Sequence, residues 1–279
     1  MLAPVVRSRG IDLSNDRTMS DLMASFRTQR PRRGPVLPEW DLAFVLYCLT
    51  KAPWEPLEDI SIQRLTLKTF FLTLLASGRR RSDVQALDVT RCAFAKNASI
   101  TVYPSRDFIP KTRAALEGNK AFSPVSIPSL SSFVGEGEPD ANLCPVRALR
   151  RYIGVTKAFR RDRKRLFISY QRNRISDIST ATLSNWVRLL VRLVYRESGA
   201  DDRTQYKISP HQIRHLAMSM ASKGTVPLED IVRAGMWSTP TTFVSYYLSD
   251  ASEVMAQSGR FRLGPIVTAQ SIVSVAEKV

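Results

Sequence analysis

"ISIQRLTLKTFFLTLLASG", residues 60–78, is the stretch that says most about the fold of this chain. Apolar side chains dominate it from Leu65 to Ala76, and it contains no proline and no glycine before its end. An apolar run of this length exceeds an ordinary strand and is typical of a buried helix. Gly78 follows the apolar run, and glycine is the residue type that most often ends a helix. The stretch therefore predicts a long, largely buried helix that stops at Gly78.

Further helical patterns lie on both sides of this stretch, at residues 38–50, 79–89, 144–159, 179–199, 209–221, 227–237 and 239–250. Three short segments instead combine β-branched or aromatic residues with nearby turn-forming residues, which is typical of strands. They are residues 98–104, 122–128 and 165–169. The pattern predicts an α+β fold that is mainly α, with a small three-stranded antiparallel sheet.

The two ends of the chain differ from this middle part. Residues 1–37 are polar and basic and offer little to bury, so we expect a flexible arm or linker, with a short local helix over 18–29 as the open alternative. Residues 38–250 carry the helical and strand patterns and are expected to form the main domain. Residues 266–279 have an apolar stripe that could form a last helix.

The charge balance indicates a nucleic-acid partner. Lys and Arg outnumber Asp and Glu by 41 to 25, giving a formal charge of +16. A guanidinium group suits phosphate oxygens because its donors form a planar fork. Arg147, Arg150 and Arg151 follow i, i+3, i+4 spacing and so share one helix face. We expect this face to contact the phosphate backbone, with a solvated charged face as the alternative.

Several function classes are disfavoured. The 3 cysteines stand alone, without metal-ligand spacing, and are expected to be free thiols of an intracellular protein. No apolar run reaches the roughly 18 residues of a membrane span, and the chain does not start with a signal-peptide pattern. There is no acidic cluster with metal spacing and no glycine-rich nucleotide loop. We therefore expect no metal, no cofactor and no membrane partner.

Four separated stretches together carry the groups of a metal-free phosphoryl transfer. Arginines can hold the nonbridging oxygens of a phosphate as charge grows on it. A histidine can handle the proton of the nucleophile, a lysine can protonate a leaving 5′ oxygen, and a tyrosine can hold the phosphate as a diester. The stretches are "LLASGRRRSDVQAL" (74–87), "FIPKT" (108–112), "HQIRH" (211–215) and "MWSTPTTFVSYYL" (236–248).

In this order, the stretches resemble the tyrosine recombinases, the integrase family of bacteriophages and transposons. A lone HxxR is weak, but HxxR with an upstream G-x-R-x-S-[DE] and a downstream W-x₉-Y is specific. "LCPVRALRRYI", "RLFIS" and the ending "W…F…YL" are closer to the eukaryotic branch carried by DIRS-type retrotransposons and Cryptons. The similarity runs from about Pro38 to Asp250 and implies the helical catalytic domain of that family.

The resemblance implies a role for each matching residue. Arg80 matches the first catalytic arginine because it stands two positions before Ser82-Asp83, whereas Arg79 and Arg81 would face the core or the DNA backbone. His211 and Arg214 match the second box, and His215 would be structural. Trp237 stands where many members have a histidine, against the scissile phosphate.

Two assignments have alternatives. Lys111 matches the mobile β-turn lysine, and Lys120 is the second candidate. Tyr247 matches the nucleophile of the DIRS-like ending, whereas the commonest family spacing from Trp237 reaches Tyr246. Adjacent helical residues point about 100° apart, so one of the two tyrosines can face the phosphate.

The resemblance further implies a nuclear, site-specific DNA recombinase that acts through a 3′-phosphotyrosine, as a dimer on one site and a tetramer in the synapse. Residues 251–279 would dock into a neighbouring subunit. A type IB topoisomerase-like enzyme and a non-catalytic DNA-binding protein are the alternatives. Family members usually carry an N-terminal clamp domain, whereas a basic arm precedes the catalytic part here, so the sequence is expected to be either a truncated form or a single-domain form.

Overall fold

The structure is a computed structural model that describes residues 16–29, 38–95, 99–109, 124–134, 137–171, 174–200, 207–223, 226–237 and 239–246. The chain divides into two compact units, residues 1–36 and 37–279. The first unit contains helix α2 (Arg17–Gln29), which begins where the Asp16 carboxylate accepts a hydrogen bond from the Met19 N–H at 2.9 Å. A local helix, the open alternative, is thus what the structure has in the stretch expected to be a flexible arm.

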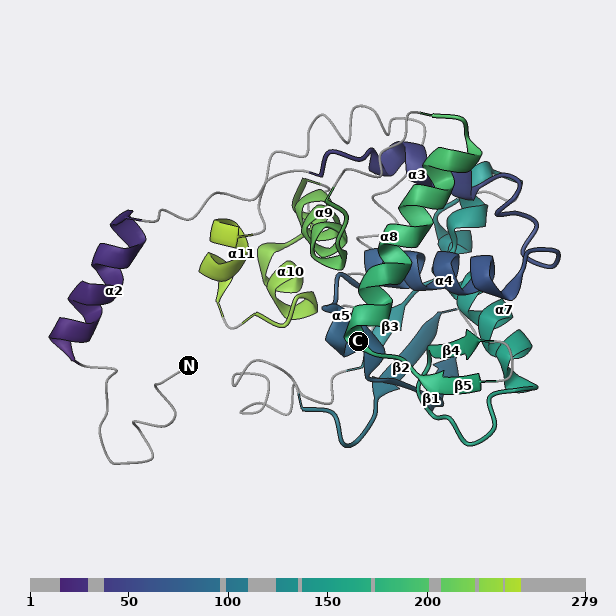
Figure 1. Ribbon diagram of the computed structural model, residues 1–279, viewed down its shortest axis with the longest axis horizontal. Helices are drawn as coiled ribbons and strands as arrows, with labels where there is room; N and C mark the ends of the chain where they lie inside the picture. The colour runs from purple at the N-terminus through teal and green to yellow at the C-terminus, as the bar shows by residue number, and fades with distance from the viewer. Residues whose placement is uncertain are drawn as a thin grey trace. The chain divides into compact units, whose positions relative to one another are not determined.

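Helix α4 (Ile62–Ser77) runs through the core of the second unit and confirms the helix expected at residues 60–78. The Ser61 hydroxyl accepts from the Arg64 N–H at its start, and Gly78 ends it in the left-handed conformation with φ 55°. Every residue from Leu65 to Ser77 is buried. Three helices pack against it: α7 (Pro145–Lys157), α8 (Thr180–Glu197) and α9 (Pro210–Lys223) (Figure 1).

The other helices of the second unit are shorter than α4. They are α3 (Leu42–Leu49), α5 (Arg81–Gln85), α10 (Leu228–Ala234), α11 (Pro240–Tyr246) and the 3₁₀ turns η3 (Leu130–Ser132) and η4 (Pro139–Leu143). Figure 1 shows α9 to α11 following one another at one side of the unit and α7 at the other, with α4 between them.

The expected small antiparallel sheet is present, and its strand order is β1-β2-β3. Strands β2 (Ile100–Pro104) and β3 (Val125–Ile127) lie where strands were expected. The remaining strand is β1 (Leu87–Phe94), which pairs with β2 through Cys92 opposite Val102. The helical expectation for 79–89 was therefore wrong beyond Gln85, because pairing with β2 outweighs the weak local helix signal.

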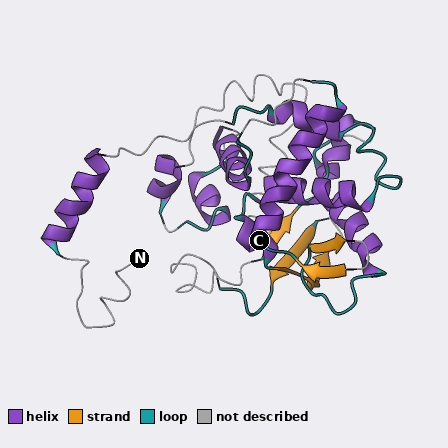
Figure 2. Ribbon diagram, in the orientation of Figure 1, coloured by secondary structure: helices purple, strands orange, loops and turns teal. Residues whose placement is uncertain are grey.

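The strand expected at 165–169 does not join this sheet. Arg165 forms an isolated bridge with Asp88, and the chain continues into β4 (Ile168–Gln171), which pairs with β5 (Arg174–Asp177) as a separate hairpin. Figure 2 shows both groups of strands gathered at one end of the helical unit. The segment 251–279 lies outside the described residues.

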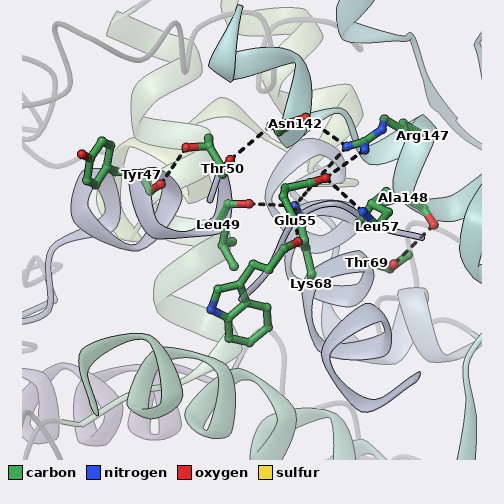
Figure 3. Close-up of polar contacts among 11 residues, drawn as sticks. Tyr47, Leu49, Thr50, Glu55, Leu57, Lys68, Thr69, Asn142, Arg147 and Ala148 are labelled. Carbon is green, nitrogen blue, oxygen red and sulfur yellow. Dashed lines mark hydrogen bonds and ion pairs between the residues drawn. The ribbon is translucent and has the colours of Figure 1, made fainter. Parts of the chain in front are cut away.

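A buried ionic cluster fixes the start of α4 to α7, and we call it the Glu55 cluster (Figure 3). The Arg147 guanidinium donates to both Glu55 oxygens at 2.8 Å. The Lys68 ammonium donates to Glu55 and to the carbonyls of Leu49 and Trp54, at 2.7 and 3.2 Å for the two carbonyls. The Lys68 side chain is fully buried. The cluster therefore ties the loop before α4 to both helices.

The charges in the Glu55 cluster shift the pKa values of its members. Burial lowers the pKa of Lys68 to about 8, although the neighbouring Glu55 carboxylate opposes the shift. Burial alone would raise the pKa of Glu55, but hydrogen bonds and charge from Arg147 and Lys68 outweigh burial and lower it. The cluster is thus a carboxylate shared by two cations.

Candidate functional site

The Arg214 side chain belongs to the stretch 211–215 and bonds to the backbone at two other places that matter for the site. Its Nη1 donates to the Gly78 carbonyl at 2.8 Å, and its Nη2 donates to the Gly235 carbonyl at 2.7 Å. Gly78 directly precedes the arginine run, and Gly235 lies two residues before Trp237. Arg214 is 1% exposed, so this fork is part of the packed interior. One guanidinium therefore brings together segments that are far apart in the sequence.

Trp237 completes this arrangement. The Arg214 guanidinium lies over its ring at 4.5 Å, within the range of a cation–π contact. The ring is buried and lies 5.5 Å from the ring of Phe243 on α11. A Cβ at Gly235 would lie 2.2 Å from the Trp237 ring, so a glycine is needed there for the ring to lie this close. Arg214 and Trp237 thus hold each other in place.

Gly78 serves the same site in two ways. Its φ of 55° suits glycine, and a Cβ there would lie 2.0 Å from the Met218 side chain on α9. Its carbonyl is one of the two that orient Arg214. The glycine therefore ends α4 and directs Arg214.

The three consecutive arginines point to different neighbours. Arg79 is buried and donates to the Pro124 carbonyl at 3.3 Å, next to β3. Arg81 donates to the Ser184 hydroxyl on α8. Arg80 stands between them as the N-cap of α5 and is partly exposed. The resemblance selected Arg80 as the catalytic arginine, and its role stands as a prediction.

Asp83 holds the backbone of this arginine run. Its carboxylate accepts hydrogen bonds from the Arg80 N–H at 3.3 Å and from the Ser82 hydroxyl at 3.2 Å. Burial lowers the pKa of the Arg79 guanidinium, while the nearby Asp83 charge opposes that shift. Sequence reasoning used Asp83 to set the register of the motif and missed its structural part. A carboxylate at the third position of a helix was the available signal.

The two histidines lie in different environments although they belong to one helix. His211 is in the first turn of α9 and exposed, whereas His215 is buried. The Gln212 side chain accepts from the Ser209 N–H at 2.8 Å and so caps the same turn. His211 is thus accessible and His215 is packed, and the catalytic role of His211 stands as a prediction.

The remaining expected catalytic residues fall outside the described part of the structure. Lys111, Lys120 and Tyr247 belong to undescribed segments. Tyr246 is the last residue of α11, and its side chain is not described. Lys111 with its alternative Lys120, and Tyr247 with its alternative Tyr246, therefore stand as predictions.

The arginines expected to contact a phosphate backbone on α7 also have neighbours within the protein, and their contact with DNA stands as a prediction. Arg147 forms the bidentate pair with Glu55 described above. Arg151 donates to the Glu58 carbonyl at 3.0 Å. The Arg150 guanidinium lies 4.4 Å from the ring of Phe94. The i, i+3, i+4 face is therefore partly committed to the fold, most completely at Arg147.

Within the described residues, no three His, Cys, Asp or Glu side chains lie close enough to hold a metal ion. The same residues contain no helix with the length and apolar character to span a membrane.

Comparison with known proteins shows the fold. No protein-family model matches this chain, and no curated protein matches its sequence. Solved structures do match it. The XerA recombinase is similar with a TM-score of 0.51 and 15% identity over 92% of this chain and 79% of that one. The XerH site-specific recombinase, in a pre-cleavage complex bound to its difH substrate, gives a TM-score of 0.50 and 10% identity over 90% of this chain and 66% of that one.

Both of these structures are tyrosine recombinases. The chain therefore has the tyrosine recombinase fold, as the order of its boxes implied, with a mainly helical domain and a small three-stranded antiparallel sheet. At these identities the likeness concerns the fold, and activity has to be argued from the site.

Proposed function

We propose that this protein is a DNA strand-exchange enzyme that cuts and rejoins duplex DNA through a 3′-phosphotyrosine. The single observation that carries the proposal is the fork from Arg214 to the carbonyls of Gly78 and Gly235. It gathers the arginine box, the HxxR box and Trp237, which are the residues a metal-free phosphoryl transfer needs around one phosphate. The similar XerH structure holds a recombination substrate, which supports DNA as the partner.

In the proposed reaction, the tyrosine hydroxyl oxygen attacks a backbone phosphorus, and the bond from phosphorus to the 5′ oxygen breaks. Arg80 and Arg214 hold the nonbridging oxygens as negative charge builds on them. His211 takes up the proton of the tyrosine, and Lys111 protonates the leaving 5′ oxygen. A 5′-hydroxyl of a second duplex then attacks the phosphotyrosine and releases the tyrosine. The number of phosphodiester bonds is conserved, so the step balances without ATP or metal.

The finer points belong to the same proposal. Tyr247 is the nucleophile and Tyr246 packs, and Trp237 contacts the scissile phosphate. Two subunits bind one site and four form the synapse. The stretch "LCPVRALRRYI" and the "W…F…YL" ending support a role in a DIRS-type or Crypton-like mobile element, and hence a place in the nucleus.

A nicked suicide duplex tests the proposal. The DNA should be taken from the sequence flanking the gene and incubated without magnesium, with wild type, Tyr246→Phe and Tyr247→Phe side by side. We expect an SDS-stable protein–DNA adduct in wild type and Tyr246→Phe and none in Tyr247→Phe. Loss in Tyr246→Phe alone would transfer the nucleophile to that residue.

Joining of the adduct to a second duplex separates strand exchange from topoisomerase-like closure of the same strand. If no adduct forms even after a clamp domain is fused to the N-terminus, the protein is a non-catalytic DNA-binding protein. Specific duplex binding in that experiment would identify this alternative directly.

A further inference from the structure

A solvent-open cavity on α7 lies apart from the candidate site. Its volume is about 400 Å³, within the range of about 300–1,000 Å³ that small-molecule sites occupy. Leu57 and Val146 supply apolar lining and are buried. The polar lining comes mainly from Ser129, Glu58, Arg150 and Arg151, with Arg147 beside them.

The cavity and the candidate site are at opposite ends of α4. Leu57 and Glu58 precede the start of α4, whereas Gly78 ends it. The helix has 16 residues, so about 24 Å separate its ends. Figure 1 also shows α7 on the far side of α4 from α9 and α10. A phosphate held at Arg214 is therefore not the group that fills this cavity.

Three guanidinium groups border the cavity, and they differ in how far the protein neutralises them. Arg147 is paired with the Glu55 carboxylate through two hydrogen bonds (Figure 3). The bond that orients Arg151 ends on the Glu58 carbonyl, which carries no net charge. Arg150 stacks on Phe94 and, among the described residues, has neither a hydrogen bond nor an ion pair. Two oriented cations thus remain against one lining carboxylate, that of Glu58.

We propose that this cavity binds a single oxyanion, a phosphate or phosphate monoester, between Arg150 and Arg151. Both guanidinium groups line the cavity, and each is already held by a neighbour, Arg151 by the Glu58 carbonyl and Arg150 by the ring of Phe94, so ordering them on binding costs little entropy. Guanidinium groups bind phosphate oxygens through paired donors. The apolar lining leaves room for a small organic group beside the phosphate. This proposal does not depend on the recombinase activity.

The cavity fits one anionic group better than a stretch of duplex. Arg147, the third cation of the face, is paired with Glu55, so two guanidinium groups in one hollow remain, too few for a run of backbone phosphates. Phosphate binding should therefore depend on a few donors in one cavity. Raising the chloride concentration should weaken phosphate binding less than it weakens the binding of duplex DNA.

Calorimetric titration of the full chain with inorganic phosphate, at constant ionic strength in chloride, tests the proposal. We expect saturable binding of one phosphate, weakened about tenfold or more by Arg150→Ala and by Arg151→Ala. Arg188→Ala, an exposed arginine on α8, is the matched control and should bind as wild type does. Glu58→Gln should bind several-fold more tightly, a gain that a misfolded variant cannot produce.

Two further titrants separate the sources of the phosphate. A deoxynucleoside 5′-monophosphate that competes with phosphate would identify a small phosphorylated ligand. The proposal is overturned if phosphate binding does not saturate, or if Arg150→Ala binds it as well as wild type does. It is also overturned if the variants weaken a 20-base-pair duplex and leave phosphate unaffected, because the face would then be a DNA-backbone contact.

Discussion

Two buried cations in this molecule, Arg214 and Lys68, are held in different ways. The Arg214 guanidinium donates to the backbone carbonyls of Gly78 and Gly235. Lys68 is also held by two carbonyls, but it shares the Glu55 carboxylate with Arg147 as well. Carbonyl bonds orient a cation without cancelling its charge, whereas a carboxylate does both. The first arrangement orients Arg214 as the proposed function requires, and the second makes a structural connection between α4, α7 and the loop before α4.

Arg214→Lys should have the largest effect of the changes considered. A lysine keeps the positive charge but lacks the planar fork that reaches both carbonyls and stacks on Trp237. We expect the yield of covalent DNA adduct to fall about 10²- to 10³-fold, the size typical for losing a donor to a transition-state oxyanion. The measurement is the initial rate of adduct formation on the suicide duplex.

Arg233→Lys is the control for that variant, since Arg233 is exposed on α10 and pairs with Asp230 at 2.9 Å. Its rate should equal that of wild type. A rate for Arg214→Lys within about threefold of wild type would show that charge alone suffices, and the comparison of the two cations would lose its functional meaning.

Glu55→Gln should disrupt the Glu55 cluster, which holds Lys68 and Arg147. The change leaves Lys68 and Arg147 without their shared carboxylate, and Lys68 is fully buried. Removing one partner of a buried ion pair costs about 3–5 kcal/mol of unfolding free energy. Urea denaturation of wild type and Glu55→Gln measures it.

Asp59→Asn, an exposed carboxylate four residues on, is the matched control and should change stability by less than about 0.5 kcal/mol. A loss below about 1 kcal/mol in Glu55→Gln would mean that the carbonyls of Leu49 and Trp54 suffice to hold Lys68.

The pH dependence of stability tests how Lys68 is held, and its expected effect is smaller than that of Glu55→Gln. The pKa of Lys68 is about 8 in the folded protein and about 10.4 in an unfolded chain. Between these values the unfolded state binds more protons, so the Lys68 contribution to stability rises with pH. Below pH 8 both states are protonated and the contribution is flat.

Lys68→Met isolates this contribution, because subtracting its unfolding free energy from that of wild type removes the other titrating groups. We expect the difference, wild type minus Lys68→Met, to increase by about 2–3 kcal/mol from pH 7 to pH 10. A flat or falling difference would show that Lys68 is not desolvated as its burial implies.

The buried helix α4 and the stretches that carry the candidate catalytic residues could be predicted from the sequence, whereas the pairing of the strands could not. The apolar run at 60–78 predicted α4 correctly because local pattern and burial agree there. Residues 87–89 were assigned to the end of a helical piece, yet they begin β1 (Leu87–Phe94), because their partner β2 is separated from them in sequence and pairing is not visible locally. The strand expected at 165–169 was similarly sent to a different sheet by its partner β5.

The candidate site shows the same division. Spacing identified Arg80, His211, Arg214 and Trp237, because motif positions belong to the chain itself. The sequence did not show that the Arg214 guanidinium bonds Gly78 and Gly235, nor that Gly235 has to lack a Cβ beside Trp237. These contacts join segments far apart in the chain, so their geometry exists only after packing.

The sequence by itself determined the helical core, the basic charge and the order of the chemical groups, because each depends on composition or on local spacing. The tertiary structure decided which arginines pair with a carboxylate and which have other neighbours. Arg147 and Arg150 look alike on one helix face, yet one meets Glu55 and the other the ring of Phe94. A side chain's partners are supplied by the elements folded against it, and for these arginines those elements come from distant parts of the chain.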